Sequence, residues 1–132
     1  FNTMNIKSSQ DLVEEANKSI QTLDPVTVKS MLDKNECVLI DVRDIRELWK
    51  EGTVKNAKHI PRGMLEFWLD PESPYYKKDI TPDKKKVLYC ASNWRSALAT
   101  KAIQEMGFDN VCHVKGGFQA IVDDGFEIEK IE

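Results

Sequence analysis

Short apolar runs alternate along this chain with stretches in which apolar residues recur every three or four positions. Continuous runs at 37–41, 87–89 and 111–114 are typical of strands that are buried on both faces of a sheet. Between them, helical spacing predicts helices whose buried faces are formed by Leu12, Val13, Ala16 and Ile20; by Val28, Met31 and Leu32; by Ile45, Leu48 and Trp49; by Ala99, Ala102, Ile103 and Met106; and by Phe118, Ile121 and Val122. Strands that alternate with helices predict a three-layer α/β sandwich with a mostly parallel central sheet flanked by helices.

Capping and turn residues indicate where these elements begin and end. Ser8 followed by Asp11 predicts the start of the first helix, and Asp24 with Pro25 predicts the start of the second. Other expected boundaries are helix ends at Gly52, Gly107 and Gly125, short strands at 20–23 and around His59 and Ile60, and a terminal strand or tail at 126–131. Breaks at Pro71, Pro74 and Pro82 limit 63–86 to short helices and loop.

The length and composition predict one globular domain. A chain of 132 residues can bury a single core, and its 41% hydrophobic and 31% charged content is that of a water-soluble protein. Residues 1–22 are expected to form an N-terminal extension with a helix, and 23–132 the single domain. Phe1–Thr3 precede an expected native start at Met4 and are left out of the fold prediction. A net charge of −3 offers no general attraction for nucleic acid or an acidic membrane, so neither is expected as a partner.

The three cysteines are Cys37, Cys90 and Cys112, an odd number without a CxxC pair. Because no histidines accompany them at ligand spacing, the sequence predicts neither a disulfide framework nor a metal site. No GxGxxG or P-loop motif is present, so no cofactor is expected. With no signal peptide visible at the N-terminus, these features favour a reducing compartment, the cytoplasm. Cys37 and Cys112 lie in predicted strands and are interpreted as core residues.

Cys90 lies where a predicted strand ends and a tight loop begins. The loop opens directly into a helix, whose first N–H groups lack partners and whose dipole attracts negative charge. Such a position, close to the guanidinium of Arg95, favours thiolate over thiol and makes a cysteine nucleophilic. A cysteine at a strand end is otherwise most often a small buried residue, but Arg95 and Ser96 at the loop exit favour the nucleophile.

Four groups of residues carry a family resemblance. They are LIDVR (Leu39–Arg43) with Glu47; Gly52 with NAKHIP (Asn56–Pro61); VLYC with the six-residue loop Cys90–Arg95; and VKGGFQA (Val114–Ala120). In this order and spacing, they resemble the rhodanese (sulfurtransferase) domain family over Leu23–Ile128.

The resemblance implies that Cys90 accepts a sulfane sulfur as a persulfide and passes it to a nucleophilic acceptor, cyanide or a thiol. The donor would be thiosulfate or an organic or protein persulfide. The expected cradle for the sulfur or the donor anion consists of N–H groups from Ala91, Ser92, Asn93, Trp94, Arg95 and Ser96. Arg95 would either brace the loop or hold an anion, and Ser96 would either donate its hydroxyl to the sulfur or cap the helix.

Two loop positions depart from thiosulfate-using relatives. Those relatives commonly have Arg directly after the cysteine and Gly two positions further on, where this chain has Ala91 and Asn93. The missing cation should weaken the binding of a dianion unless Arg62 or the lysines near Lys77 compensate. Asn93 is expected to tolerate a left-handed backbone. Trp94 is interpreted as a wall packed on the loop, with shaping of a mouth for the donor as the alternative.

The remaining polar residues are interpreted structurally. Asp41, Arg43 and Glu47 are expected to form an ion network, and His59 and His113 to have structural roles. The lysines at 77–86 predict a solvated surface.

Two other functions stay open. One is a sulfur carrier or interaction module without turnover of its own. The other is a cysteine phosphatase, disfavoured because four residues separate Cys90 from Arg95 where phosphatase loops have five, and because Tyr89 stands where those loops often carry His.

Overall fold

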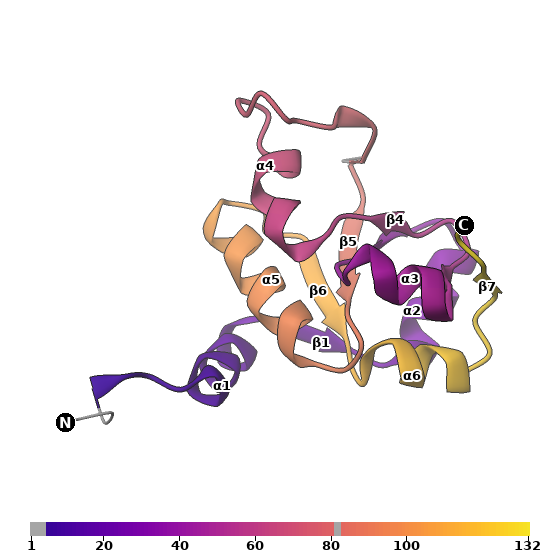
Figure 1. The fold of residues 1–132 in the computed structure, drawn as a ribbon, viewed down its shortest axis with the longest axis horizontal. Helices are drawn as coiled ribbons and strands as arrows, with labels where there is room; N and C mark the ends of the chain where they lie inside the picture. The colour runs from indigo at the N-terminus through magenta and orange to yellow at the C-terminus, as the bar shows by residue number, and fades with distance from the viewer. Residues whose placement is uncertain (1–4, 81–82) are drawn as a thin grey trace.

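A five-stranded parallel sheet forms the centre of the molecule, as a computed structural model of residues 5–80 and 83–132 shows (Figure 1). Across the sheet the strands lie in the order β1 (Gln21–Leu23), β6 (Val111–Val114), β5 (Lys85–Tyr89), β2 (Cys37–Asp41) and β4 (Lys58–His59), and all neighbours are parallel. β5 is therefore the central strand, and Cys90 follows its carboxyl end. The expected native start at Met4 and the helix-breaking Pro82 lie outside the described residues.

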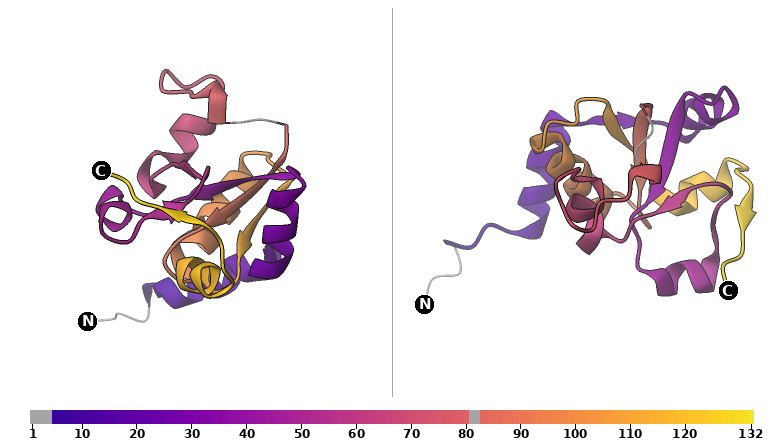
Figure 2. Two further views of the ribbon diagram at one scale, coloured as in Figure 1. Left: turned by 90° about the vertical axis from the view of Figure 1, so that its right-hand side faces the viewer. Right: turned by 90° about the horizontal axis from the view of Figure 1, so that it is seen from above.

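Helices cover both faces of this sheet and complete the predicted three layers (Figure 2). One face carries α1 (Ser9–Ser19), α4 (Leu65–Leu69) and α5 (Trp94–Glu105), and the other carries α2 (Pro25–Asp33) and α6 (Gly117–Asp123). The remaining helices are α3 (Ile45–Glu51) and the 3-10 turns η2 (Arg62–Met64) and η3 (Lys78–Ile80). Ser8 caps α1 by accepting the Asp11 N–H at 3.0 Å, as predicted. No helix in the described ranges is long and apolar enough to cross a bilayer.

The strands supply two separate cores, because successive side chains point to opposite faces of a sheet. Val87 and Tyr89 pack with α2 and α6, whereas Leu88 and Cys90 pack with α4 and α5. This double burial explains the continuous apolar runs. Cys37 and Cys112 are core residues, as predicted, and lie in the core that faces α2 and α6. Burial raises the pKa of each thiol to about 11.

A second sheet of two antiparallel strands joins β3 (Thr53–Val54) to β7 (Ile128–Glu129). The structure has a strand where the sequence predicted either a terminal strand or a tail. The sequence did not predict β3. Gly52 precedes β3 with φ +83°, and a Cβ there would lie 2.7 Å from the Glu129 carbonyl oxygen. Both the backbone conformation and this close approach therefore require glycine.

The N-terminal helix and strand are packed on the rest of the domain. α1 contacts α5, and β1 pairs with β6, so the predicted boundary between residues 22 and 23 falls within β1. Five apolar residues whose spacing predicted burial are exposed: Leu12, Ile45, Trp49, Met106 and Val122. The apolar stripe predicted for these helices is therefore wider than the face that each one buries.

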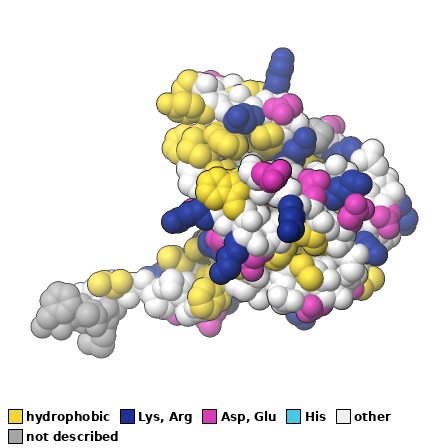
Figure 3. Space-filling model, turned by 45° about the vertical axis from the view of Figure 1, so that its right-hand side comes forward, with side chains coloured by type: hydrophobic (Ala, Val, Ile, Leu, Met, Phe, Trp, Pro, Cys, Tyr) yellow, Lys and Arg dark blue, Asp and Glu magenta, His cyan; other side chains and the backbone are white. Residues whose placement is uncertain are grey.

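Charged side chains of both signs are mixed over one face of the molecule, while hydrophobic side chains gather over α4 and the segment after it (Figure 3). Phe67 and Tyr75 are exposed there. Within the basic run at 77–86, Lys86 departs from the predicted solvated surface. It is buried, its Nζ lies 5.2 Å from the Phe108 ring centroid, and burial lowers its pKa.

Candidate active site

Cys90 sits at the carboxyl end of the central strand and is only 1% exposed. Its Sγ accepts the Ser96 backbone N–H at 3.3 Å and donates to Ser96 Oγ at 3.4 Å. Helix α5 begins at Trp94, so Ser96 lies in its first turn rather than at its start, and the free loop is shorter than expected. Ser96 therefore contacts the sulfur through both its backbone and its side chain.

The loop is held in place by the turn that leads into α6. The Cys90 carbonyl accepts the Phe118 N–H at 2.8 Å, and Asn93 Oδ1 accepts the Gly116 N–H at 2.7 Å. Asn93 does not adopt the left-handed backbone that it was expected to tolerate, since its φ is −129°. The left-handed residues are instead Gly116 and Gly117 in the facing turn. A Cβ on Gly117 would lie 2.7 Å from the Ala91 carbonyl, so the loop packs on bare glycine backbone.

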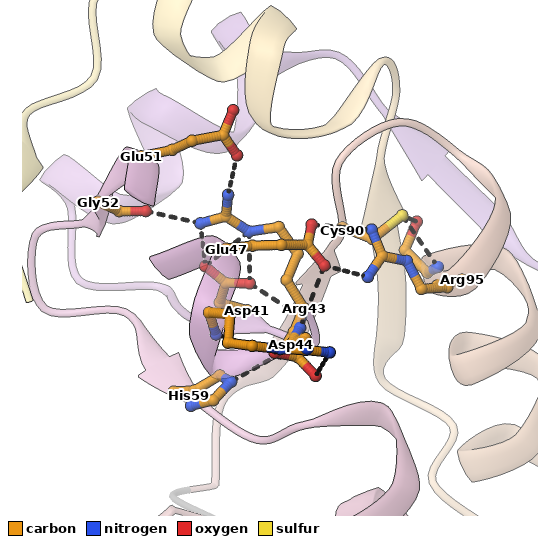
Figure 4. A network of polar contacts seen from close by, with 11 residues as sticks. Asp41, Arg43, Asp44, Glu47, Glu51, Gly52, His59, Cys90 and Arg95 are labelled. Carbon is orange, nitrogen blue, oxygen red and sulfur yellow. Dashed lines mark hydrogen bonds and ion pairs between the residues drawn. The ribbon is translucent and has the colours of Figure 1, made fainter. Parts of the chain in front are cut away.

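Arg95 is directed at Glu47 (Figure 4). Its Nη1 lies 2.6 Å from Glu47 Oε1 and its Nη2 3.1 Å from Oε2, a bidentate pair. This hydrogen bonding is the main cause that raises the pKa of Arg95, and it is also the main cause that lowers the pKa of Glu47. The fork that could hold an oxyanion is thus engaged by a carboxylate, and Arg95 braces the loop.

Glu47 reaches the loop because α3 begins with a capping box. Asp44 caps the helix, and its backbone N–H donates to Glu47 Oε1 at 3.3 Å. The sequence predicted that Glu47 joins Asp41 and Arg43 in one ion network, whereas the structure pairs Glu47 with Arg95. The Asp44-x-x-Glu47 pattern is a capping-box signature and could have separated them.

Asp41 and Arg43 form a buried network of their own, as predicted. Arg43 is fully buried, donates to Asp41 at 2.8 Å and to the Gly52 carbonyl at 2.7 Å, and lies 4.0 Å from the Phe118 ring centroid. The Tyr89 hydroxyl donates to Asp41 at 2.7 Å, and burial raises the pKa of Tyr89. These contacts give the network a structural role.

The two histidines differ in their contacts. His59 Nε2 bonds the Arg43 carbonyl at 2.7 Å, which fits the predicted structural role. His113 Nδ1 lies 2.8 Å from Ser96 Oγ, so this imidazole adjoins the group that contacts Cys90. The sequence showed only that His113 lies in a strand; its placement beside α5 depends on how β6 pairs with β5.

The remaining predicted site residues differ in exposure and pairing from what the sequence led us to expect. Ala91 and Ser92 are exposed, and Trp94 is 58% exposed, so it is not a wall packed on the loop. Arg62, one of the candidates for a compensating cation, pairs with Glu66 at 2.8 Å. Across residues 5–80 and 83–132, no group of three acidic, Cys or His side chains could hold a metal ion.

The model of the rhodanese-like domain family matches residues 24–124, which include the strand, loop and helix around Cys90. The chain belongs to the rhodanese-like domain family. This finding confirms the resemblance drawn from the four groups of residues. The parallel sheet with helices on both faces agrees with it, because solved structures of this family have the same fold.

Two relatives in the family are much longer than this chain. A tRNA uridine(34) hydroxylase of Erwinia tasmaniensis is 33% identical over 90 residues, which are 68% of this chain and 25% of that protein. A probable adenylyltransferase/sulfurtransferase MoeZ of Mycobacterium tuberculosis is 32% identical over 100 residues, which are 75% of this chain and 24% of that protein. The chain therefore spans about a quarter of the length of these relatives.

One solved structure is similar over nearly the whole chain. A Rhodopseudomonas palustris protein of unknown function, described as a possible tyrosine phosphatase, is 42% identical with a TM-score of 0.88. The similarity covers 94% of this chain and 96% of that one. The two proteins therefore share this fold over nearly the whole length of both chains.

Proposed function

We propose that this domain is a sulfurtransferase in which Cys90 carries the sulfur as a persulfide. The proposal rests on the position of Sγ at the end of β5, in contact with the Ser96 N–H and hydroxyl. The Cys90 thiolate attacks the sulfane sulfur of the donor, a new S–S bond forms, and the donor leaves with the electron pair of the broken bond. A thiolate or cyanide then attacks the outer sulfur and releases the Cys90 thiolate.

The donor class that the loop favours is an organic or protein persulfide rather than thiosulfate. Arg95 is paired with Glu47, and position 91 is an alanine, so no loop side chain offers a free cation to a dianion. The exposed Trp94 instead provides apolar area beside the loop. Thiosulfate:cyanide transfer is expected to be measurable but slow.

A sulfur carrier without turnover of its own is the second candidate. The length comparison favours it, because the relatives contain this domain as about a quarter of a longer protein. A carrier would load one sulfur on Cys90 but would not turn over with a small acceptor. Repeated cycles of loading and release with a thiol or cyanide would favour the enzyme over the carrier.

Phosphatase activity fits the loop less well. A phosphate ester would need the Arg95 fork, which Glu47 occupies at 2.6 and 3.1 Å. Turnover of an aryl phosphate without any sulfur transfer would reverse this ranking.

Intact-mass measurement tests the proposal directly. The protein is exposed to thiosulfate, mercaptopyruvate or a small persulfide, and its mass is recorded before and after cyanide is added. One added sulfur atom, removed by cyanide and absent in Cys90→Ser, is expected. The matched control is Cys112→Ser, a buried thiol that should leave the adduct in place. Failure of every donor to load Cys90 would refute the proposal.

A further inference from the structure

A chain of polar groups runs from Cys90 to the protein surface. Sγ lies 3.4 Å from Ser96 Oγ, which lies 2.8 Å from His113 Nδ1. On the other side of the ring, His113 Nε2 lies 3.0 Å from Oγ1 of Thr22, an exposed residue on β1. The four groups come from four different elements, so the tertiary fold brings them together.

His113 has uncharged surroundings. It is 1% exposed, and burial lowers its pKa, which favours the neutral ring. Its register partners are Thr22 on β1 and Leu88 on β5, while α5 presents the Ser96 hydroxyl. The titratable group at the end of the chain is Cys90, next to which lies the charged pair of Arg95 and Glu47.

A neutral imidazole between two hydroxyls can adopt two arrangements. With the proton on Nε2, the ring donates to Thr22, accepts the Ser96 O–H at Nδ1, and leaves Ser96 Oγ free to accept the Cys90 S–H. With the proton on Nδ1, the ring donates to Ser96, whose hydroxyl then donates to a Cys90 thiolate, while Thr22 donates to Nε2. Each tautomer therefore matches one protonation state of the sulfur.

We propose that His113 is a positioning residue that switches between these two neutral tautomers and so turns the Ser96 hydroxyl to suit thiol or thiolate at Cys90. The inference rests on the proposed role of Cys90 as the nucleophile. It requires no charge on the buried ring in either state.

The proton balance of the switch is simple. The S–H proton passes to Ser96 Oγ, and the Ser96 proton passes to His113 Nδ1. The Nε2 proton passes to Thr22 Oγ1, and the original Thr22 proton leaves to a base in solution, water or buffer. Sulfur keeps the bonding electron pair, so the net change is loss of one proton from Cys90. This route ends at β1, so a donor bound at the loop does not block it.

The test follows the His113 tautomer and the Cys90 thiolate in the same protein sample. Long-range proton–nitrogen correlation spectra of histidine-labelled protein identify which ring nitrogen carries the proton. Ultraviolet thiolate absorbance, taken as the difference from Cys90→Ser, reports ionisation of Cys90. Cys37 and Cys112 contribute no thiolate absorbance near neutral pH, because burial raises the pKa of each to about 11.

The expected result is an Nε2–H ring with the thiol, an Nδ1–H ring with the thiolate, and coincident midpoints for the two signals. If Cys90 is ionised at every pH tested, the wild type should show Nδ1–H and Cys90→Ser should show Nε2–H. Ser96→Ala should uncouple the signals, so that Cys90 still ionises while the ring no longer responds.

Three results would overturn the inference: the same tautomer in Cys90→Ser and in the wild type at a pH where Cys90 is ionised, a ring protonated on both nitrogens when the thiolate forms, or continued coupling in Ser96→Ala. None of these measurements uses a sulfur donor. A failed switch with a normal persulfide adduct would therefore reject His113 alone, while a coupled switch with no adduct would reject the sulfurtransferase.

Discussion

Arg95 illustrates how one side chain can stabilise a site without contacting the reactive atom. Both terminal nitrogens bond Glu47, which in turn is oriented by the capping box of α3. The guanidinium still interacts electrostatically with Cys90. The Glu47 carboxylate therefore partly cancels the electrostatic effect of the Arg95 charge on the sulfur.

Glu47→Gln should increase the fraction of thiolate at Cys90. Glutamine preserves the shape of the brace but removes the carboxylate charge, so the Arg95 cation acts on the sulfur uncancelled. Since the pair is partly exposed, the gain should be about 1 kcal/mol, a severalfold faster alkylation of Cys90 at neutral pH. Glu15→Gln on α1, which breaks a pair with Lys7, is the control and should change nothing. Slower alkylation in Glu47→Gln would mean that bracing outweighs charge.

At the scale of elements, α6 fixes the loop by starting with two left-handed glycines. Gly117→Ala should displace the loop, because the new Cβ would meet the Ala91 carbonyl. Gly125→Ala at the other end of α6 is the matched control, with φ +84° but open space. Both variants should lose about 1–2 kcal/mol from the left-handed backbone. In denaturant unfolding, Gly117→Ala should lose more, and only this variant should lose Cys90 reactivity; equal effects would contradict the packing argument.

Tyr89 links the two sheets. Its hydroxyl donates to Asp41, lies 2.9 Å from Thr53 Oγ1 and accepts the Val54 N–H at 3.2 Å. Tyr89→Phe should lower the free energy of unfolding by about 1–3 kcal/mol, because buried partners lose a hydrogen bond. Urea titration measures the change, and the exposed Tyr75→Phe serves as the reference. A loss of unfolding free energy no larger than that of Tyr75→Phe would show that the network rearranges to compensate for the missing hydroxyl.

For the whole molecule, stability should fall under mild acid because His113 is buried in its neutral form. Burial lowers its pKa from 6.5, so below that value the unfolded chain binds a proton that the folded chain excludes. This contribution is complete above pH 6.5 and is lost as pH falls toward the folded pKa, by at most about 1.4 kcal/mol per pH unit. His113→Asn should show a flatter dependence in pH-resolved urea titrations, and parallel curves would refute the argument.

Local signals in the sequence were sufficient for much of this fold. The Ser8 cap, the run Cys37–Asp41 and the strand before Cys90 depend on neighbouring residues, and each appears as predicted. The contacts that define the site depend on topology. Glu47 lies 48 positions from Arg95, and His113 lies 17 from Ser96. Helix and strand periodicity carries no information about such pairs.

The hydrogen bond that closes the loop at Asn93 could not be predicted from the sequence either. The side chain could be expected to permit a left-handed backbone, but its amide oxygen instead accepts the Gly116 N–H. That bond depends on the turn between β6 and α6 lying against the loop. Adjacent strands supply both segments, and only the strand order shows that they meet.

The strand order has a further consequence for the behaviour of the protein at high concentration. The two edges of the central sheet are β1 with three residues and β4 with two. Long exposed edges invite strands of other molecules to pair with them, and short edges limit that pairing. The longer strands, with their strongly apolar sequences, are enclosed between these edges. The short edges therefore limit edge-to-edge aggregation, and the exposed Lys58 adds a charge to the β4 edge.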